Sequence, residues 1–385
     1  MPRLAHRLLR LAASVEEEVD TRWFRLKQKR GWVRPVRILP YLGFGTADVL
    51  HLKGRVLEAN GIAPARERDT VWKNVRMSVR RFNSAEIPCV RVRARAFGAE
   101  TVVETDHEGY FDVRLRPKEP LPPGVVWHDV ALELLDEVVP GQGPVRACGC
   151  VQVPPADVQY GVISDIDDTV LETGATGLLR MLRLTLFYNA YTRTPFEGVS
   201  DFYRALEQGN GHGPRNPVFY VSSSPWNLYD LLVQFFEVRE IPAGTLMLRD
   251  LGLDAGTFGP GRHDRHKLAQ IERVLATYPD LRFILVGDSG QRDPEIYSRV
   301  VQSYPGRVCA IYIREVTSGA REAEVHALAE AVRRKGVELL LVKDTAAAAR
   351  HAVARGYLRP DLLEDLLAGT VDNPMPIEEV AEEAS

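Results

Sequence analysis

The stretch YGVISDIDDTVLETG (160–174) holds the residues from which the architecture and chemistry of this chain can be worked out. It opens with an apolar run that predicts a buried strand. Two aspartates separated by one residue, Asp165 and Asp167, follow where that strand ends. Carboxylates at such a place are costly in free energy unless they meet a cation. Because carboxylate and carbonyl oxygens suit Mg²⁺, the stretch predicts a magnesium site.

Beyond this stretch, apolar runs alternate with patterns typical of helices. The further apolar runs lie at 218–222, 245–248, 282–288, 308–313 and 337–342, and the helical patterns lie at 225–238, 265–277, 292–303 and 320–335. Strands that are apolar throughout and alternate with helices predict a parallel sheet covered on both faces. In such sheets the ligand lies at the carboxyl ends of the strands. We therefore expect the reactive residues just after these runs.

Polar side chains stand at the ends of later apolar runs and near the start of one helix. Ser222 precedes a helical pattern, where a hydroxyl and free backbone amides favour a phosphate oxygen. Lys267 lies near the start of the next helix. Asp288 ends a later apolar run, and Asp293 follows five residues beyond it. We expect these groups to meet Asp165 at one edge of the sheet.

Residues 30–155 predict a different fold, in which short strands alternate apolar and polar residues. Strands are expected at 90–97, 100–106, 110–115, 128–135 and 145–153, with 100–106 and 110–115 joined as a hairpin. Short strands at this spacing predict an antiparallel sandwich. No set of catalytic groups occurs in this region. We expect it to serve binding or orientation, for a protein partner that the sequence does not identify.

The 385 residues suggest two domains, at roughly 100–200 residues each. We expect an amphipathic helix at 1–29, a β-sandwich accessory domain at 30–156, an α/β domain at 157–368 and an acidic flexible tail at 369–385. The helix has two interpretations. It could lie on an anionic membrane surface, or it could pack against the body of the protein, and base rates favour packing.

Charge and hydropathy exclude several classes of protein. The net charge of −3 argues against nucleic-acid binding, which needs a strongly basic surface. No apolar run approaches the ~20 residues that span a bilayer. The N-terminus also lacks the apolar core of a secretory signal. We therefore expect a cytoplasmic protein, with a peripheral position at a membrane as the alternative.

Several motifs resemble a known family. The segment ISDIDDTV (163–170) resembles the signature of the haloacid dehalogenase superfamily of aspartate-nucleophile phosphatases, and later elements such as GDSGQRD (287–293) follow in that superfamily's order. The segments SDIDDTVLETG, YVSSSPWNLYDLL, HKLAQI and GDSGQRDPEIY resemble the App1-like phosphatidate phosphatase family. This resemblance covers about 157–357 well and 30–155 loosely. It implies a haloacid-dehalogenase-like parallel sheet with helices on both faces, preceded by a smaller all-β sandwich.

The resemblance also implies a role for each matching residue. Asp165 would be the nucleophile that attacks phosphorus. Asp167 would protonate the leaving group and then activate water. Thr169 would orient Asp167, Ser222 would bind a phosphoryl oxygen, and Lys267 would neutralise phosphoryl charge.

The implied cofactor is Mg²⁺. Its ligands would be the carboxylate of Asp165, the backbone carbonyl of Asp167 and the carboxylate of Asp288. Asp293 would complete the metal site by supporting Asp288 or a metal-bound water. Mg²⁺ and Lys267 together would cancel the repulsion between a phosphate dianion and the attacking carboxylate.

The implied activity is hydrolysis of phosphatidate to diacylglycerol and phosphate. The same mechanism on a soluble phosphomonoester or phosphoprotein stays open, as does a non-catalytic lipid- or protein-binding module. About fifty residues separate the first motif from Ser222, which leaves room for a small helical insert at 174–192 and for no large cap domain. That insert is apolar with basic residues, a pattern that suits a lipid interface or a helix folded over the core.

Overall fold

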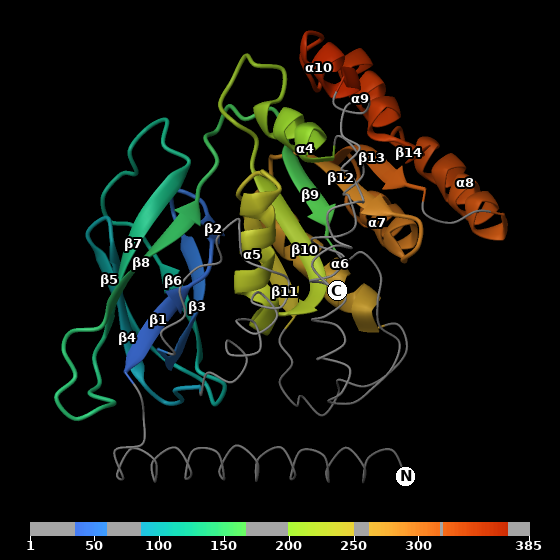
Figure 1. Ribbon diagram of the computed structural model, residues 1–385. Helices are drawn as coiled ribbons and strands as arrows, with labels where there is room; N and C mark the ends of the chain where they lie inside the picture. Colours follow the sequence, from blue (N-terminus) through green and yellow to red (C-terminus); the bar gives the residue numbers. More distant parts are fainter. Residues whose placement is uncertain (1–34, 60–85, 167–198, 250–261, 316–318, 369–385) are drawn as a thin grey trace, which may run out of the picture.

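The computed structural model describes residues 35–59, 86–166, 199–249, 262–315 and 319–368. The chain is a mixed α/β protein with one mainly antiparallel sheet and one parallel sheet, which lie beside each other (Figure 1). The expected helix at 1–29, the insert at 174–192 and the tail at 369–385 lie outside the described residues.

Eight strands form the N-terminal sheet. They are β1 (Val36–Pro40), β2 (Gly43–Gly45), β3 (Leu50–Glu58), β4 (Arg91–Ala96), β5 (Ala99–Glu104), β6 (Tyr110–Leu115), β7 (Trp127–Leu134) and β8 (Arg146–Gln152). Their order is β1-β3-β2-β8-β7-β4-β5, and β6 pairs with β3. Buried and exposed residues alternate along β7, as expected for a strand with one face in a core. Its buried residues pack in one hydrophobic cluster with those of β3, β4 and β6.

The expected hairpin between 100–106 and 110–115 is wrong, although both strands form. β5 pairs antiparallel with β4, and β6 pairs antiparallel with β3. The turn between them is tight, because the Asp106 side chain accepts hydrogen bonds from the backbone N–H groups of Glu108 and Tyr110. This turn therefore passes the chain from one part of the sheet to another.

The parallel sheet has six strands. They are β9 (Gly161–Asp165), β10 (Val218–Pro225), β11 (Thr245–Arg249), β12 (Phe283–Asp288), β13 (Val308–Arg314) and β14 (Glu338–Val342). Their spatial order is β11-β10-β9-β12-β13-β14, so the direction of winding reverses between β9 and β12. Ligands of open α/β sheets bind outside the carboxyl ends of the strands at such a reversal. This topology points to the edge where β9 and β12 end.

Helices cover both faces of the parallel sheet (Figure 1). They are α4 (Val199–Gln208), the 3₁₀ turn η1 (Trp226–Leu228), α5 (Tyr229–Val238), α6 (Arg262–Thr277), α7 (Asp293–Ser303), α8 (Ala320–Arg333), α9 (Thr345–Ala354) and α10 (Leu362–Ala368). Neighbouring strand residues point to opposite faces, and Val162 packs with α4, α5 and α9 while Ile163 packs with α6, α7 and α8. The run at 160–166 is apolar throughout because both faces of β9 are buried.

A short segment of β2 joins the two sheets. Phe44 is 4% exposed and belongs to the hydrophobic cluster of α6, α7 and the parallel strands. The Gly45 N–H donates to the Tyr278 hydroxyl at 3.2 Å, and the Thr245 hydroxyl donates to the Gly43 carbonyl at 2.9 Å. Because one sheet places a side chain in the core of the other, the two sheets form one packed body.

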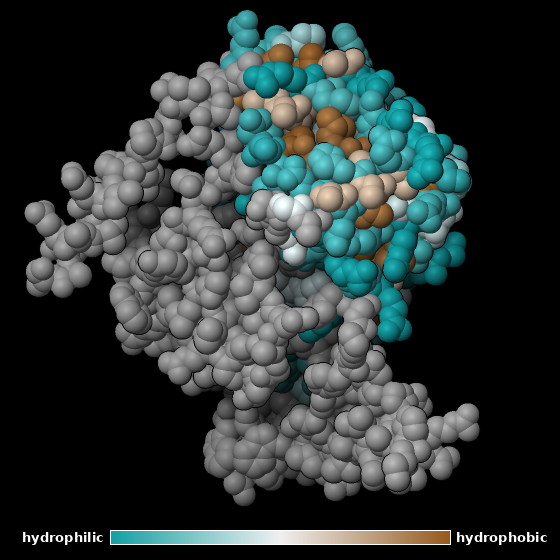
Figure 2. All heavy atoms as spheres, turned by 90° about the vertical axis from the view of Figure 1, so that its right-hand side faces the viewer, coloured by the Kyte–Doolittle hydropathy of each residue, from teal (hydrophilic) through white to brown (hydrophobic). Residues whose placement is uncertain are grey.

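The face that carries α8, α9 and α10 is mostly hydrophilic, with hydrophobic side chains in small groups (Figure 2). Among the described residues, no helix combines the length and the apolar character that crossing a membrane requires.

Candidate active site

Three aspartates converge at the edge of the parallel sheet where β9 and β12 end. Asp165 is the last residue of β9, Asp288 is the last residue of β12, and Asp293 begins α7. One carboxylate oxygen of each lies within 4.8 Å of the others. All three side chains are largely buried, with 3% exposure for Asp165 and 0% for Asp293. The topology of the sheet thus gathers residues that are more than 100 positions apart.

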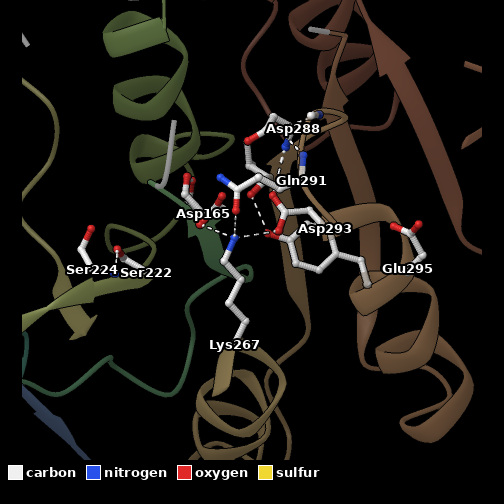
Figure 3. Close-up of polar contacts among 12 residues, drawn as sticks. Asp165, Ser222, Ser224, Lys267, Asp288, Gln291, Asp293 and Glu295 are labelled. Carbon is white, nitrogen blue, oxygen red and sulfur yellow. Dashed lines mark hydrogen bonds and ion pairs between the residues drawn. The ribbon is translucent and has the colours of Figure 1, made fainter. Parts of the chain in front are cut away.

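Lys267 reaches this group from the second turn of α6. Its Nζ lies 2.8 Å from Asp165 Oδ1 and 3.0 Å from Asp293 Oδ1. It also donates to Gln291 Oε1 at 2.8 Å. Figure 3 shows the ammonium pointing to Asp165, Gln291 and Asp293 together. With an exposed fraction of 4%, this ammonium supplies one positive charge to a buried group of carboxylates.

The loop after β12 folds around Asp288. The backbone N–H groups of Gly290 and Gln291 donate to Asp288 Oδ1 at 2.7 and 3.0 Å. Asp293 Oδ2 accepts a hydrogen bond from the Asp288 N–H at 3.1 Å. A Cβ at Gly287 would lie 2.5 Å from Asp293 Oδ2 and 2.8 Å from Asp293 Cβ. The glycine is therefore required, because any side chain there would displace the carboxylate of Asp293.

Three carboxylates meet at this site, and Lys267 pairs with two of them, Asp165 and Asp293. Burial and, after it, the nearby Asp293 carboxylate raise the pKa of Asp288 to about 6, although hydrogen bonds from Gln291 and Gly290 and the charge of Lys267 act in the opposite direction. A divalent cation with a preference for oxygen ligands would offset the negative charge of the carboxylates, and this donor set fits Mg²⁺.

Ser222 lies on the other flank of Asp165, on the neighbouring strand. Val221 is the register partner of Asp165, so Ser222 stands one residue beyond the end of β9. It is fully buried, and its hydroxyl oxygen accepts a hydrogen bond from the Ser224 N–H at 2.9 Å. Figure 3 shows both serines on the side of Asp165 away from Asp293.

The antiparallel sheet holds the turn that follows Ser222. The Tyr41 ring stacks on Trp226 with centroids 4.8 Å apart, and the Leu42 N–H donates to the Tyr229 hydroxyl at 2.7 Å. The Tyr110 hydroxyl donates to Asn227 Oδ1 at 2.9 Å. These contacts place η1 and the start of α5 directly against the N-terminal sheet.

The structure brings together Asp165, Lys267, Asp288 and Asp293, as the strand-end rule predicts, and it places Ser222 on the adjacent strand. Asp167 and Thr169 lie outside the described residues. Sequence reasoning did not assign Gln291 a role, although it lies within the segment GDSGQRD (287–293). Its spacing from Asp288 was the only signal, because its contact with Lys267 arises from folding.

Comparisons with known proteins concern mainly the parallel part of the chain. Residues 160–315 match the family described as phosphatidate phosphatase APP1, catalytic domain. Over 167 residues the chain is 32% identical to phosphatidate phosphatase APP1 of Saccharomyces cerevisiae, which covers 43% of this chain and 27% of the yeast protein. Over 160 residues it is 32% identical to an uncharacterized protein of Schizosaccharomyces pombe, which covers 41% of this chain and 25% of that protein. The chain thus spans about a quarter of the length of both relatives.

Solved structures resemble this chain only weakly. A carbohydrate acetylesterase from Xanthomonas citri has a TM-score of 0.24 and 12% identity, and the match covers 76% of this chain and 72% of the esterase. The PilB minor pilin of Streptococcus sanguinis has a TM-score of 0.25 and 9% identity, with coverage of 75% and 90%. TM-scores this low carry no argument about the fold. By sequence, residues 160–315 are similar to the family described as phosphatidate phosphatase APP1, catalytic domain.

Proposed function

We propose that this protein is a magnesium-dependent phosphatase that hydrolyses phosphatidate through an aspartyl-phosphate on Asp165. The observation that carries the proposal is the convergence of Asp165, Asp288 and Asp293, two of them paired with Lys267, within a region that matches the App1 catalytic family. A buried carboxylate beside an ammonium suits nucleophilic attack on phosphorus, because positive charge offsets the repulsion of the phosphate dianion.

The residues that would hold Mg²⁺ are Asp165 and Asp288, with Asp293 beside them and the backbone carbonyl of Asp167 completing the set. When bound, the ion would supply positive charge to the phosphoryl oxygens and to the buried carboxylates. Lys267 would keep the carboxylate of Asp165 oriented through the contact at 2.8 Å. Asp293 would fix the backbone of Asp288 by accepting its N–H.

The proposed reaction has two half-reactions. In the first, an Asp165 oxygen forms a bond to phosphorus, the ester P–O bond breaks, and Asp167 gives its proton to the leaving alkoxide. In the second, Asp167 takes a proton from water, the water oxygen attacks phosphorus, and the bond to Asp165 breaks to release phosphate. Thr169 would orient Asp167, and the Ser222 hydroxyl would hydrogen-bond a phosphoryl oxygen.

We further infer that the two sheets are a haloacid-dehalogenase-like domain and a β-sandwich. For the first, support comes from the strand order, the reversal between β9 and β12, and the aspartates at that point. For the second, support comes from the single hydrophobic cluster shared by β3, β4, β6 and β7. The proposed boundaries are 30–156 and 157–368.

A lipid substrate implies work at a membrane surface, so we propose a cytoplasmic protein that binds membranes peripherally.

The test uses the full chain with phosphatidate in vesicles and with soluble phosphomonoesters. We expect phosphate release from the vesicles that EDTA abolishes and Mg²⁺ restores. Asp165→Asn should remove turnover, whereas Asp280→Asn, at an exposed position after α6, should leave it unchanged. Full turnover in Asp165→Asn would refute the mechanism. Activity confined to soluble esters would refute the lipid substrate, and a wild-type protein without any phosphatase activity would refute the function.

A further inference from the structure

Arg321, in the first turn of α8, connects that helix to the loop that carries Asp288. Its Nη1 and Nη2 donate to the two carboxylate oxygens of Glu295 on α7 at 2.7 and 2.9 Å. Its Nε donates to the Ser289 carbonyl at 3.0 Å, and its Nη2 also donates to the Gln291 carbonyl at 2.7 Å. Because the five N–H groups of a guanidinium lie in one rigid plane, this side chain fixes two backbone carbonyls and a carboxylate together.

One peptide group transmits the contact of Arg321 to Asp288. The Ser289 carbonyl and the Gly290 N–H belong to the same peptide group, and in a planar trans peptide they point in opposite directions. The carbonyl faces Arg321, while the N–H donates to Asp288 Oδ1 at 2.7 Å. The bond to Arg321 therefore sets the direction of the Gly290 N–H, and it polarises the peptide so that this donor becomes stronger.

Gln291 supplies a second route from Arg321 to the site. Its carbonyl accepts from Arg321, and its own N–H donates to Asp288 Oδ1 at 3.0 Å. Its side-chain Oε1 accepts from Lys267 at 2.8 Å. Figure 3 shows this side chain beside Lys267 and Asp288. A residue whose backbone is held by Arg321 thus contacts both the ammonium and a candidate metal ligand.

We propose that Arg321 is a positioning residue that holds the loop after β12 and thereby sets the affinity of the site for Mg²⁺. This inference rests on the magnesium site of the proposed function. Asp288 presents one oxygen to the two loop amides, which leaves its other oxygen in a fixed direction. Without Arg321 the two loop carbonyls lose these hydrogen bonds, the amides are oriented less firmly, and Asp288 is held less rigidly for the cation.

A purely structural role would make a different prediction. In that case Arg321 would only tie α8 to α7 through Glu295, with a contribution from Glu324 at 3.0 Å. Its removal would then lower the melting temperature of the protein in EDTA. The dissociation constant of Mg²⁺ would stay unchanged, because the loop would keep its shape.

The experiment is calorimetric titration of the metal-free full chain with MgCl₂ alone. We expect Arg321→Met to raise the dissociation constant of Mg²⁺ by roughly 10–100-fold, the range found when a group that orients a metal ligand is removed. Arg321→Lys keeps the charge but lacks the planar fork, so we expect a smaller rise of at least roughly 3-fold. If Arg321→Met does not fold, the Mg²⁺ affinity of Arg321→Lys serves as the test.

Two variants control for charge and for anchoring. Arg333→Met removes an arginine of the same helix whose exposed ion pair with Glu330 lies far along α8, and it should leave Mg²⁺ affinity unchanged. Glu295→Gln weakens the anchor to α7 but leaves Arg321 able to donate to both loop carbonyls. We expect this variant to lower the melting temperature and to leave the dissociation constant of Mg²⁺ close to that of the wild type.

Equal Mg²⁺ affinity in the wild type and in the folded Arg321 variant would overturn the inference, and so would equal losses in Arg321→Met and Arg333→Met. These outcomes differ from failure of the proposed function. The wild type could bind Mg²⁺ more tightly than Arg321→Met and yet release no phosphate. That result would refute the phosphatase activity and support the inference about Arg321. A wild type that binds no Mg²⁺ would refute both the magnesium-dependent function and the inference about Arg321.

Discussion

The site has two flanks at the same edge of the parallel sheet, one with Asp288 and Asp293 and one with Ser222. Different parts of the chain pack against each flank. On one flank, Asp288 and Asp293 are enclosed by α6, α7 and α8, and their contacts are with charged or backbone groups. On the other flank, Ser222 leads into η1 and α5, which pack against aromatic residues of the antiparallel sheet such as Tyr41. The N-terminal sheet thus supports the Ser222 flank through these aromatic residues, and through Phe44 it also packs in the hydrophobic cluster of α6 and α7.

The two flanks should therefore respond differently to the cation. The carboxylate flank is rich in negative charge. The loss in the free energy of unfolding caused by a substitution there should therefore depend on Mg²⁺. The aromatic flank is held by ring stacking and neutral hydrogen bonds, whose energies should not depend on it. Stability measured in EDTA and in Mg²⁺ therefore separates the two flanks.

The largest effect is expected for Lys267→Met on the carboxylate flank. Loss of the ammonium leaves Asp165 and Asp293 buried without their shared cation. We expect a loss of roughly 3–5 kcal/mol in the free energy of unfolding in EDTA. We also expect a drop of roughly 10²–10³ in kcat, the range for loss of one group that stabilises transition-state charge. Urea unfolding with and without Mg²⁺ checks the first effect, and Mg²⁺ should restore part of the stability.

A comparable stability loss with a different signature is expected for Tyr41→Ala on the aromatic flank. Tyr41 is 2% exposed and lies against Trp226 and Tyr229, with centroids 4.8 and 4.2 Å away. Removing a buried aromatic ring costs about 3–5 kcal/mol. We expect the same loss in EDTA and in Mg²⁺ by urea unfolding. A loss that Mg²⁺ reverses would contradict the separation of the flanks.

The smallest effect is expected for Tyr110→Phe. This change removes only the hydroxyl that donates to Asn227 Oδ1, and Arg55 still reaches the same oxygen at 3.4 Å. We expect a loss of about 0.5–1.5 kcal/mol in the free energy of unfolding. In a double-mutant cycle with Asn227→Ala, the two changes should be less than additive. Additive losses would show that the bond between the sheets contributes nothing.

The sequence predicted the parallel sheet well because its strands are buried on both faces. All six apolar runs became strands β9 to β14, and the helical patterns became η1 with α5, α6, α7 and α8. α9 was not predicted, since its sequence TAAAARHAVA gives little contrast between a buried and an exposed face. The pairing of β6 with β3 was not predicted either, because strand partners depend on contacts between distant residues.

The candidate site divides in the same way. The meeting of Asp165, Asp288 and Asp293 could be predicted, since parallel strands bring their carboxyl ends to one edge. Arg321 could not, because it lies in a helix with several other arginines and glutamates, and its local pattern resembles theirs. Only the folded loop, with carbonyls turned toward α8, distinguishes it from Arg333.

Phe44 has a consequence for how this protein is made. Synthesis proceeds from the N-terminus, so β2 leaves the ribosome before β10 and α6, whose residues cover this ring. At ~5–20 residues per second, the chain from 153 to 278 takes roughly 6–25 s to appear. We expect nascent chains to expose Phe44 and Tyr41 throughout that interval. We expect chaperones to bind these two exposed aromatic rings during those seconds. When synthesis is fast, we expect other unfinished chains to bind them as well.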